Sequence, residues 1–359
     1  MKLESGKKSV IIIIVLVIMI IILSMVLISS TVKKGQKKTP KNIKIGISIY
    51  DEYDTFISDM VQYINQWAKE KEQQTGIAIS LEVVAANGSQ LTQNDQVEKF
   101  IDKKCDVICV NLVDRTDATV IIDKVKSAGI PVVFFNRELV KEDLERWDKL
   151  YYVGAKAEES GEMQAKLVTD ALSDKEIFEK TDTNGDGTIQ YVMLEGEAGH
   201  QDALVRTQVS IEEITKAGIS VEKLGDEIAN WNRAQAATKM KTLLAKYSWQ
   251  IELVIANDDD MALGAIDALN DSGVKKWPMI VGVNGTKDAL EMVKAKKMDG
   301  TVYNDAPDQA DAIMKIAYGL AVNGKVPDDM NFTDGKYIYV PYRIINYDNV
   351  QEYIRKLQQ

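Results

Sequence analysis

The sequence predicts an α/β protein built from two lobes, each a doubly wound parallel sheet. From Lys44 onward, short runs rich in β-branched residues alternate with helical patterns. The strand runs are apolar along their whole length, which is typical of parallel strands that are covered by helices on both faces. Ten candidate strands exceed the usual size of a single open sheet, so we expect two sheets, each with its own helices.

The elements follow from hydrophobic periodicity in chain order. The candidate strands are 44–50, 79–84, 106–110, 131–135, 151–153, 189–194, 219–224, 252–256, 279–283 and 300–303. The candidate helices are 55–73, 91–103, 117–128, 157–172, 201–217, 232–246, 258–272, 286–296 and 306–322. In the first helix, apolar residues recur every three or four positions from Ile57 to Ala68, which predicts one buried face.

The first 42 residues differ from the rest of the chain. Ile11 to Leu27 is apolar except for Ser24, and it approaches the length that spans a bilayer. A secretion signal usually has an apolar core of about 7–15 residues, and this run is longer. We therefore expect an anchor that is not cleaved, with a cleaved signal as the alternative. The lysines that follow the run go against the positive-inside tendency.

Charge and cysteine content exclude several classes of protein. Residues 43–359 hold 36 basic and 53 acidic residues, a net charge of −17. Such a surface argues against nucleic acid and anionic lipid as partners. Cys105 and Cys109 stand four residues apart in a predicted strand, about 13 Å from each other, so they cannot form a disulfide bond. We expect buried free thiols.

A loop at 182–190 resembles the start of an EF-hand. Its candidate oxygen donors are Asp182, Asn184, Asp186, the carbonyl of Thr188 and Gln190. Gly187 occupies the position that the EF-hand turn requires, but Met193 stands where the bidentate Glu belongs. If Ca²⁺ binds, its last carboxylate must come from elsewhere in the chain. The alternative is a surface turn rich in Asx and Gly without a metal.

Polar side chains follow the predicted strands in both halves of the chain. They are Asp54, Asn111, Asn136, His200, Asp202, Arg206, Asn257, Asp258, Asn284 and Asn304, and Phe56 and Trp231 are aromatic residues nearby. A single Asn or Asp after a strand is usually a helix cap or turn residue. Their repetition favours a ligand site instead, because parallel sheets bind ligands beyond the carboxyl ends of their strands.

These residues closely resemble the periplasmic glucose/galactose-binding protein family, the calcium-containing sugar receptors of ABC importers and chemotaxis. The resemblance covers nearly everything from Lys44 to Leu357. Its motifs, in order, are IGISIY before Asp54-Thr55-Phe56, QNDQ (93–96), VNLVD (110–114), PVVFFN (131–136), YYVG (151–154), the calcium loop, EGEAGHQDA (195–203), NWN (230–232), IELVIAND (251–258) and GTVYNDA (300–306). The implied fold is that of type I periplasmic binding proteins, with two Rossmann-like lobes.

The resemblance also implies roles for single residues. Asp54, Asn111, His200, Asp202, Arg206 and Asn304 match positions that hydrogen-bond sugar hydroxyls, and Phe56 and Trp231 match the rings that cover the two faces of the pyranose. The loop residues Asp182, Asn184, Asp186, Thr188 and Gln190 match the calcium ligands, and Glu252 matches the carboxylate that a distant strand supplies.

Two positions depart from the family pattern. Asp258 stands where the best-known members have Asn, and Asn284 stands where they have Asp. The exchange keeps one carboxylate and one amide in the site, so we interpret it as a compensated swap that preserves pyranose binding. It leaves the choice between glucose and galactose open, because that choice depends on which hydroxyl meets which group.

No catalytic constellation accompanies these residues. His200 is the single histidine, and no Ser or Cys nucleophile lies in a recognisable triad context. Asp54 and Asp202 could be the acid and base of a glycosidase, but carboxylates among Asn and Arg are more simply hydroxyl binders. A histidine can also be a surface or structural residue. We therefore predict a binding protein without enzymatic activity.

The sequence thus predicts a monomeric, extracytoplasmic galactose- or glucose-binding protein that serves an ABC importer or a chemoreceptor. A membrane-tethered sensor that presents sugar to a kinase is the alternative. A sugar-responsive repressor would need a helix-turn-helix motif near the start, where this chain has an apolar run. The expected lobes are 43–132 plus 304–336 and 133–303 plus 337–359, after a signal or anchor segment at 1–42.

Overall fold

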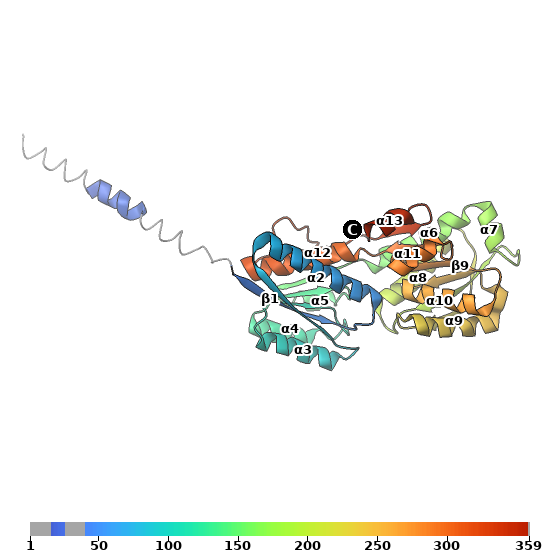
Figure 1. Ribbon diagram of the computed structural model, residues 1–359, viewed down its shortest axis with the longest axis horizontal. Coiled ribbons are helices and arrows are strands. Elements are labelled where there is room, and N and C mark those ends of the chain that lie inside the picture. Colours follow the sequence, from blue (N-terminus) through green and yellow to red (C-terminus); the bar gives the residue numbers. More distant parts are fainter. Residues whose placement is uncertain (1–15, 26–39, 358–359) are drawn as a thin grey trace, which may run out of the picture.

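The computed structural model describes residues 16–25 and 40–357, and its main body consists of two lobes (Figure 1). Residues 16–25 are helical, with exposed apolar side chains. Among the residues described, no helix combines the length and the apolar character needed to cross a membrane. The expected anchor begins and ends outside the described residues, so it stays a prediction.

Both lobes contain a sheet of predominantly parallel strands, as predicted. Within the described ranges, the strand order is β11-β5-β4-β3-β1-β2 in the first sheet and β12-β10-β9-β8-β6-β7 in the second. The strands of the first sheet are β1 (Asn42–Ile49), β2 (Ala78–Ala85), β3 (Val107–Val110), β4 (Val132–Phe135), β5 (Leu150–Gly154) and β11 (Tyr337–Tyr339). Those of the second are β6 (Ile189–Glu195), β7 (Val221–Ile228), β8 (Leu253–Ala256), β9 (Met279–Asn284), β10 (Gly300–Tyr303) and β12 (Arg343–Asn346).

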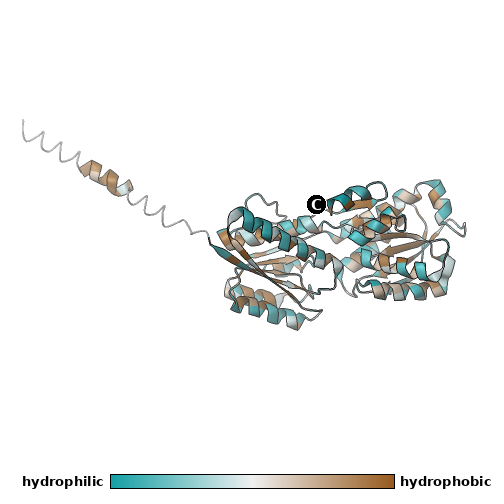
Figure 2. Cartoon of the chain, viewed as in Figure 1, coloured by the Kyte–Doolittle hydropathy of each residue, from teal (hydrophilic) through white to brown (hydrophobic). Residues whose placement is uncertain are grey.

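Helices cover the sheets with their apolar faces inward and their polar faces toward solvent (Figure 2). They are α2 (Thr55–Thr75), α3 (Gln90–Asp102), α4 (Thr119–Ala128), α5 (Lys141–Leu144), α6 (Ala157–Leu172), α7 (Lys175–Thr181), α8 (Gln201–Lys216), α9 (Arg233–Tyr247), α10 (Asp259–Ser272), α11 (Lys287–Lys294), α12 (Ala306–Asn323) and α13 (Val350–Lys356). The sequence missed the short helices α5, α7 and α13 and the late strands β11 and β12.

The expected lobe boundaries at 132/133 and 336/337 are wrong. Strands β4 and β5 pair with β3 and with each other in the first sheet, and β11 pairs with β5. The chain therefore enters the second lobe only after β5, returns to the first before α12, and crosses again between β11 and β12. The physical reason is that β4 and β5 complete the ladder beside β3, a pairing that periodicity alone does not specify.

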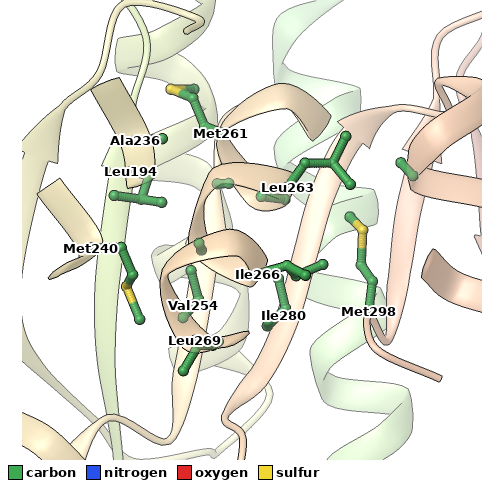
Figure 3. Close-up of a cluster of buried hydrophobic side chains, with 14 of the residues drawn as sticks. Leu194, Ala236, Met240, Val254, Met261, Leu263, Ile266, Leu269, Ile280 and Met298 are labelled. Atoms are coloured by element: carbon green, nitrogen blue, oxygen red, sulfur yellow. The ribbon is translucent and has the colours of Figure 1, made fainter. Parts of the chain in front are cut away.

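The second lobe illustrates how tightly these layers pack. Met240 of α9, Met261 and Ile266 of α10, and Val254 of β8 meet in one buried cluster (Figure 3). Gly264 faces α9, where an added Cβ would lie 2.3 Å from the Arg233 carbonyl oxygen. The two helices can approach this closely only because Gly264 has no side chain.

Candidate functional site

A cleft between the lobes collects most of the residues that the sequence singled out. Its lining residues are Tyr50, Asp54, Phe56, Asn136, Arg137, His200, Asp202, Arg206, Trp231, Asp258, Asn284 and Asn304. Nine of the ten residues expected to bind sugar are among them, and Phe56 and Trp231 come from opposite lobes. The cleft leaves only about 30 Å³ of free space, so the two lobes already lie close together around it.

Asp54 is fixed at the first-lobe side by two hydrogen bonds. It caps helix α2, where its Oδ1 accepts from the Ile57 N–H at 2.9 Å. Its Oδ2 accepts from the Tyr50 hydroxyl at 2.5 Å. Burial and the neighbouring Asp54 carboxylate raise the pKa of Tyr50, so the phenol remains a donor to that carboxylate. The remaining lone pairs of Asp54 can still accept hydrogen bonds from a ligand.

Asn111 is the one expected sugar ligand that does not line the cleft. Its side chain is completely buried, and its Oδ1 accepts from the Tyr50 N–H at 3.2 Å. Its Nδ2 donates to Asn136 Oδ1 at 2.9 Å. Both amide atoms therefore support neighbouring residues, and in this structure Asn136 lines the cleft while Asn111 lies behind it.

His200 begins helix α8 and presents a neutral ring to the cleft. Burial lowers the pKa of His200 well below its usual value, and the nearby Arg137 lowers it further. The ring Nδ1 accepts from the Asp202 N–H at 3.1 Å, so the single proton of the neutral ring is on Nε2. His200 can therefore act as a hydrogen-bond donor to a neutral ligand.

Arg206 binds together several parts of the second lobe. Its Nε donates to Ser160 Oγ at 2.9 Å and its Nη1 to the Asn257 carbonyl at 3.0 Å. Its Nη2 donates to the Tyr342 hydroxyl at 3.0 Å and to Asp202 Oδ2 at 3.3 Å. Burial raises the pKa of Asp202, and the guanidinium of Arg206 opposes that effect.

Trp231 is held in an unusual backbone conformation. Its φ is +58°, and that of Asn230 is +52°, a region that side chains other than glycine rarely adopt. Such strain is often found at functional sites. The indole packs against the edge of the His200 ring, with centroids 5.1 Å apart. It also covers Gly196, where a Cβ would come within 2.0 Å of the ring, so this position must be glycine.

The exchanged pair and Asn304 lie together on the second-lobe side of the cleft. Asp258 caps α10 by accepting from the Met261 N–H at 2.8 Å. Asn284 ends β9 with a φ of +119°, and its Oδ1 accepts from Asn304 Nδ2 at 3.4 Å. Burial raises the pKa of Asp258 well above its usual value, and the negative charge of Asp260 adds to this.

The sequence missed three residues of the cleft: Tyr50, Asn136 and Arg137. Asn136 had stood out as a polar strand end but was not assigned to the site. Tyr50 ends the IGISIY motif four residues before Asp54, and Arg137 follows the polar strand end Asn136, so the signal that could have found them was proximity in the chain to residues that already stood out. Neither Tyr nor Arg at such a position is distinctive without the fold.

Five of the six residues expected to hold calcium belong to the loop 182–190, and Glu252 contacts that loop. Asp182 Oδ1 accepts from the Gly185 N–H at 2.8 Å, which closes the loop. Glu252 reaches it from just before β8: its Oε1 accepts from the backbone N–H of Thr183, and its Oε2 from the Gln190 N–H at 3.1 Å. Glu252, which is distant from the loop in sequence, therefore contacts it in the structure.

The side-chain oxygens of this loop accept hydrogen bonds from within the loop. Gln190 Oε1 lies 3.1 Å from Asn184 Nδ2, and Asp186 Oδ2 lies 2.9 Å from the same nitrogen. No group of three or more His, Cys, Asp or Glu within the described part of the chain is arranged to hold a metal. The set at the loop is a mixture of carboxylate and amide groups, the oxygen donors that Ca²⁺ takes.

Comparisons with known proteins agree with this architecture. Residues 45–325 match the family model described as a periplasmic binding protein domain. The chain belongs to the periplasmic binding protein family. It is 34% identical over 314 residues to the D-galactose/methyl-galactoside binding periplasmic protein MglB of Haemophilus influenzae, an alignment that covers 87% of this chain and 92% of that protein. It is 31% identical to a putative rhizopine-binding protein of Rhizobium meliloti, over 77% of this chain and 82% of that one.

Solved structures of this periplasmic binding protein family show the same two-lobed fold. An ABC transporter solute binding protein from Bacillus halodurans C-125 with bound myo-inositol superposes with a TM-score of 0.73 at 28% identity, covering 89% of this chain and all of that one. Proteins of this family bind solutes outside the cytoplasm and do not transform them. The chain is accordingly an extracytoplasmic binding protein and not an enzyme, as predicted.

Replacing Asp258 by Asn should stabilise the unliganded protein increasingly as pH rises. The folded-state pKa of Asp258 is raised, so its protonated form favours folding. This contribution is complete below the unfolded pKa of about 4 and is lost as pH rises through the folded pKa. Asn mimics the protonated carboxyl and can still cap α10.

Thermal melts of D258N and the wild type at pH 4, 6 and 8 measure this effect. The midpoint difference should be small at pH 4 and reach about 2 °C or more at pH 8. Asp271→Asn, at an exposed position of the same helix, is the control and should give a constant difference. A D258N midpoint that does not rise relative to the wild type with pH would contradict the proposed cost of the buried carboxylate.

Proposed function

We propose that this protein binds a pyranose sugar of the D-galactose or D-glucose type and delivers it to an ABC importer. The observation that carries the proposal is the pair Phe56 and Trp231, which come from different lobes and line one cleft with carboxylates, amides and two guanidinium groups. The similarity to MglB, which is named for D-galactose and methyl-galactoside binding, supports the same class of ligand.

The chemistry of the cleft suits a ring of hydroxyls with apolar faces. Each hydroxyl that leaves water must regain its hydrogen bonds, or about 1–3 kcal/mol is lost per unsatisfied group. Asp54, Asp202 and Asp258 offer acceptors, whereas His200 and Asn304 offer donors. The aromatic rings can cover the C–H faces of the sugar.

Closure of the lobes links binding to recognition by a partner. A ligand that contacts both lobes favours the closed arrangement by its differential affinity for that state. The importer can then distinguish loaded from empty protein by shape. A chemoreceptor, or a kinase served by a tethered form of the chain, would exploit the same closure, and both stay predictions. We expect the protein to act as a monomer.

Isothermal titration calorimetry with D-galactose and D-glucose tests the proposal directly. At least one sugar should bind at pH 7, and Trp231→Ala should weaken it about 10- to 100-fold, or about 1.4–2.8 kcal/mol, because one sugar face loses its cover. Tyr347→Ala removes a half-exposed ring outside the cleft and should leave the affinity unchanged. Absence of heat with both sugars from pH 6 to 8 would refute the proposal.

We also propose that the loop 182–190 binds a structural Ca²⁺. Asp182, Asn184, Asp186, Gln190 and Glu252 would supply side-chain oxygens, and Thr188 its carbonyl. The support is the contact of Glu252 with the loop backbone and the oxygen-rich donor set. The ion would join the loop to the segment that leads into β8, and its binding energy would add to the stability of the folded state.

Melting with and without Ca²⁺ tests this second proposal. Excess Ca²⁺ should raise the midpoint, and a chelator should lower it, because the ion binds the folded state and not the unfolded chain. Glu252→Gln should remove most of the Ca²⁺-dependent shift, whereas Glu222→Gln, an exposed position on β7, should retain it. If neither Ca²⁺ nor the chelator changes the melting midpoint of the wild type, the loop binds no Ca²⁺.

A further inference from the structure

A hollow at the amino ends of β8, β9 and β10 lies on the opposite edge of the second sheet from the cleft between the lobes. Ile251 and Glu252 precede β8, Met279 begins β9 and Asp299 precedes β10. The cleft, by contrast, collects residues from the carboxyl ends of the same strands, and no residue lines both places. The volume of the hollow is about 780 Å³, a size that is usual for ligand sites.

Five lysines line this hollow, and none of them is paired with an acidic residue in the part of the chain that the structure describes. They are Lys180, Lys275, Lys276, Lys296 and Lys297. Lysines elsewhere on the surface have carboxylate partners, as Lys239 has in Glu227 at 2.9 Å and Lys325 in Asp328 at 2.7 Å. Because residues 43–359 carry a net charge of −17, this concentration of lysines is opposite in sign to the rest of the surface.

The two carboxylates of the hollow do not neutralise these lysines. Glu252 Oε2 accepts from the Gln190 N–H at 3.1 Å, and its Oε1 accepts from the Thr183 N–H. Asp299 Oδ2 accepts from the Ile280 N–H at 2.7 Å. Five lysines and two carboxylates leave an excess of three positive charges. Such a concave, positively charged site attracts an anionic ligand.

Two tryptophans add apolar surface to the same hollow. Trp249 is 61% exposed, and it follows Ser248, whose φ of +51° is in a region that residues other than glycine rarely adopt. Trp277 is partly buried against the core of the second lobe, and Lys297 Nζ lies 5.6 Å from its ring centroid. Tryptophan is enriched at binding surfaces because one ring buries a large apolar area on contact.

Indoles beside lysines match a ligand in which apolar ring faces alternate with acidic groups. Sugar rings have C–H faces that pack on aromatic side chains, and carboxylate or phosphate substituents pair with lysine. A lipid surface fits less well. Helix α7, which lines the hollow, and β1, which follows the predicted anchor, lie at opposite ends of the main body (Figure 1).

We propose that this hollow binds an anionic glycan, a chain of sugar units with carboxylate or phosphate substituents. The two indoles cover sugar faces, and the five lysines pair with the acidic groups. All residues of the hollow belong to the second lobe, so a glycan bound there leaves the cleft free to open and close. The inference is independent of the hexose binding proposed for the cleft.

Calorimetry of the full chain with oligogalacturonate and with phosphomannan fragments tests the proposal and distinguishes the two acidic groups. At least one of them should bind, and its affinity should fall about 10-fold or more between about 20 and 300 mM NaCl, because salt screens the lysines. Trp249→Ala should weaken binding about 5- to 10-fold, because one sugar face loses its cover. K275Q/K276Q should weaken it about 3- to 10-fold, because two charges are removed.

Matched changes outside the hollow are the controls. K69Q/K99Q removes two exposed lysines from helices of the first lobe, and Tyr53→Ala removes a ring that is 83% exposed in that lobe. Both should bind the glycan as the wild type does. Dextran, a neutral glycan, should bind at least about 10-fold more weakly than the anionic glycan. Melting curves establish that each variant is folded.

Every other outcome overturns the proposal. It is refuted if neither anionic glycan binds, or if W249A and K275Q/K276Q both bind as tightly as the wild type. Inorganic polyphosphate that binds as tightly as the glycans, without an effect of W249A, would mean that the hollow attracts charge alone. Tighter binding to vesicles of anionic phospholipid would assign it to a lipid surface. Failure of hexose binding in the cleft would leave this inference untouched, since the two places share no residue.

Discussion

Arg206 and Asp258 carry ionisable groups that are almost completely shielded from water, and the side chain of Asp202 beside Arg206 is only 16% exposed. A buried charge is tolerated only where partners replace its hydration, and the geometry of the cleft follows from that requirement. Arg206 meets it by donating to a carboxylate, a hydroxyl, a phenol and a carbonyl at once. The carboxyl edges of two parallel sheets provide these partners, because strand ends bring backbone carbonyls, helix starts and polar side chains to the same edge.

The residues of the cleft differ in how many of their hydrogen-bonding groups have partners within the protein. Arg206 and Asp54 are already hydrogen-bonded and act as fixed supports. Burial raises the pKa of Asp258, and Nε and Nη2 of Arg137 make no hydrogen bond with any described residue. Strained backbone at Trp231 and Asn284 belongs to the same pattern, at a cost of about 1–3 kcal/mol for each residue. Stability is reduced where binding requires it, which is common at functional sites.

Much of this protein could be predicted from sequence because its signals are local. Apolar strand runs and helical periodicity located ten strands and nine helices to within a few residues. Family motifs, and not periodicity, led to Glu252 as the residue that contacts the loop 182–190. The boundaries between the two lobes could not be predicted from these local signals. Whether β4 and β5 extend the first sheet or begin the second depends on pairing between strands distant in sequence, and the apolar runs are compatible with either neighbour.

The sequence by itself determined the α/β class, the acidic surface and the polar strand ends, because each depends on residue type and local spacing. The tertiary structure decided which of those polar ends face one another. It placed Asn111 behind the cleft, where both of its amide atoms have protein partners. It brought Arg137 over Tyr50 and across to Glu197, although an arginine at that position is not distinctive in the local sequence. A side chain's role in the cleft depends on what surrounds it in space, and that environment comes from segments far apart in the chain.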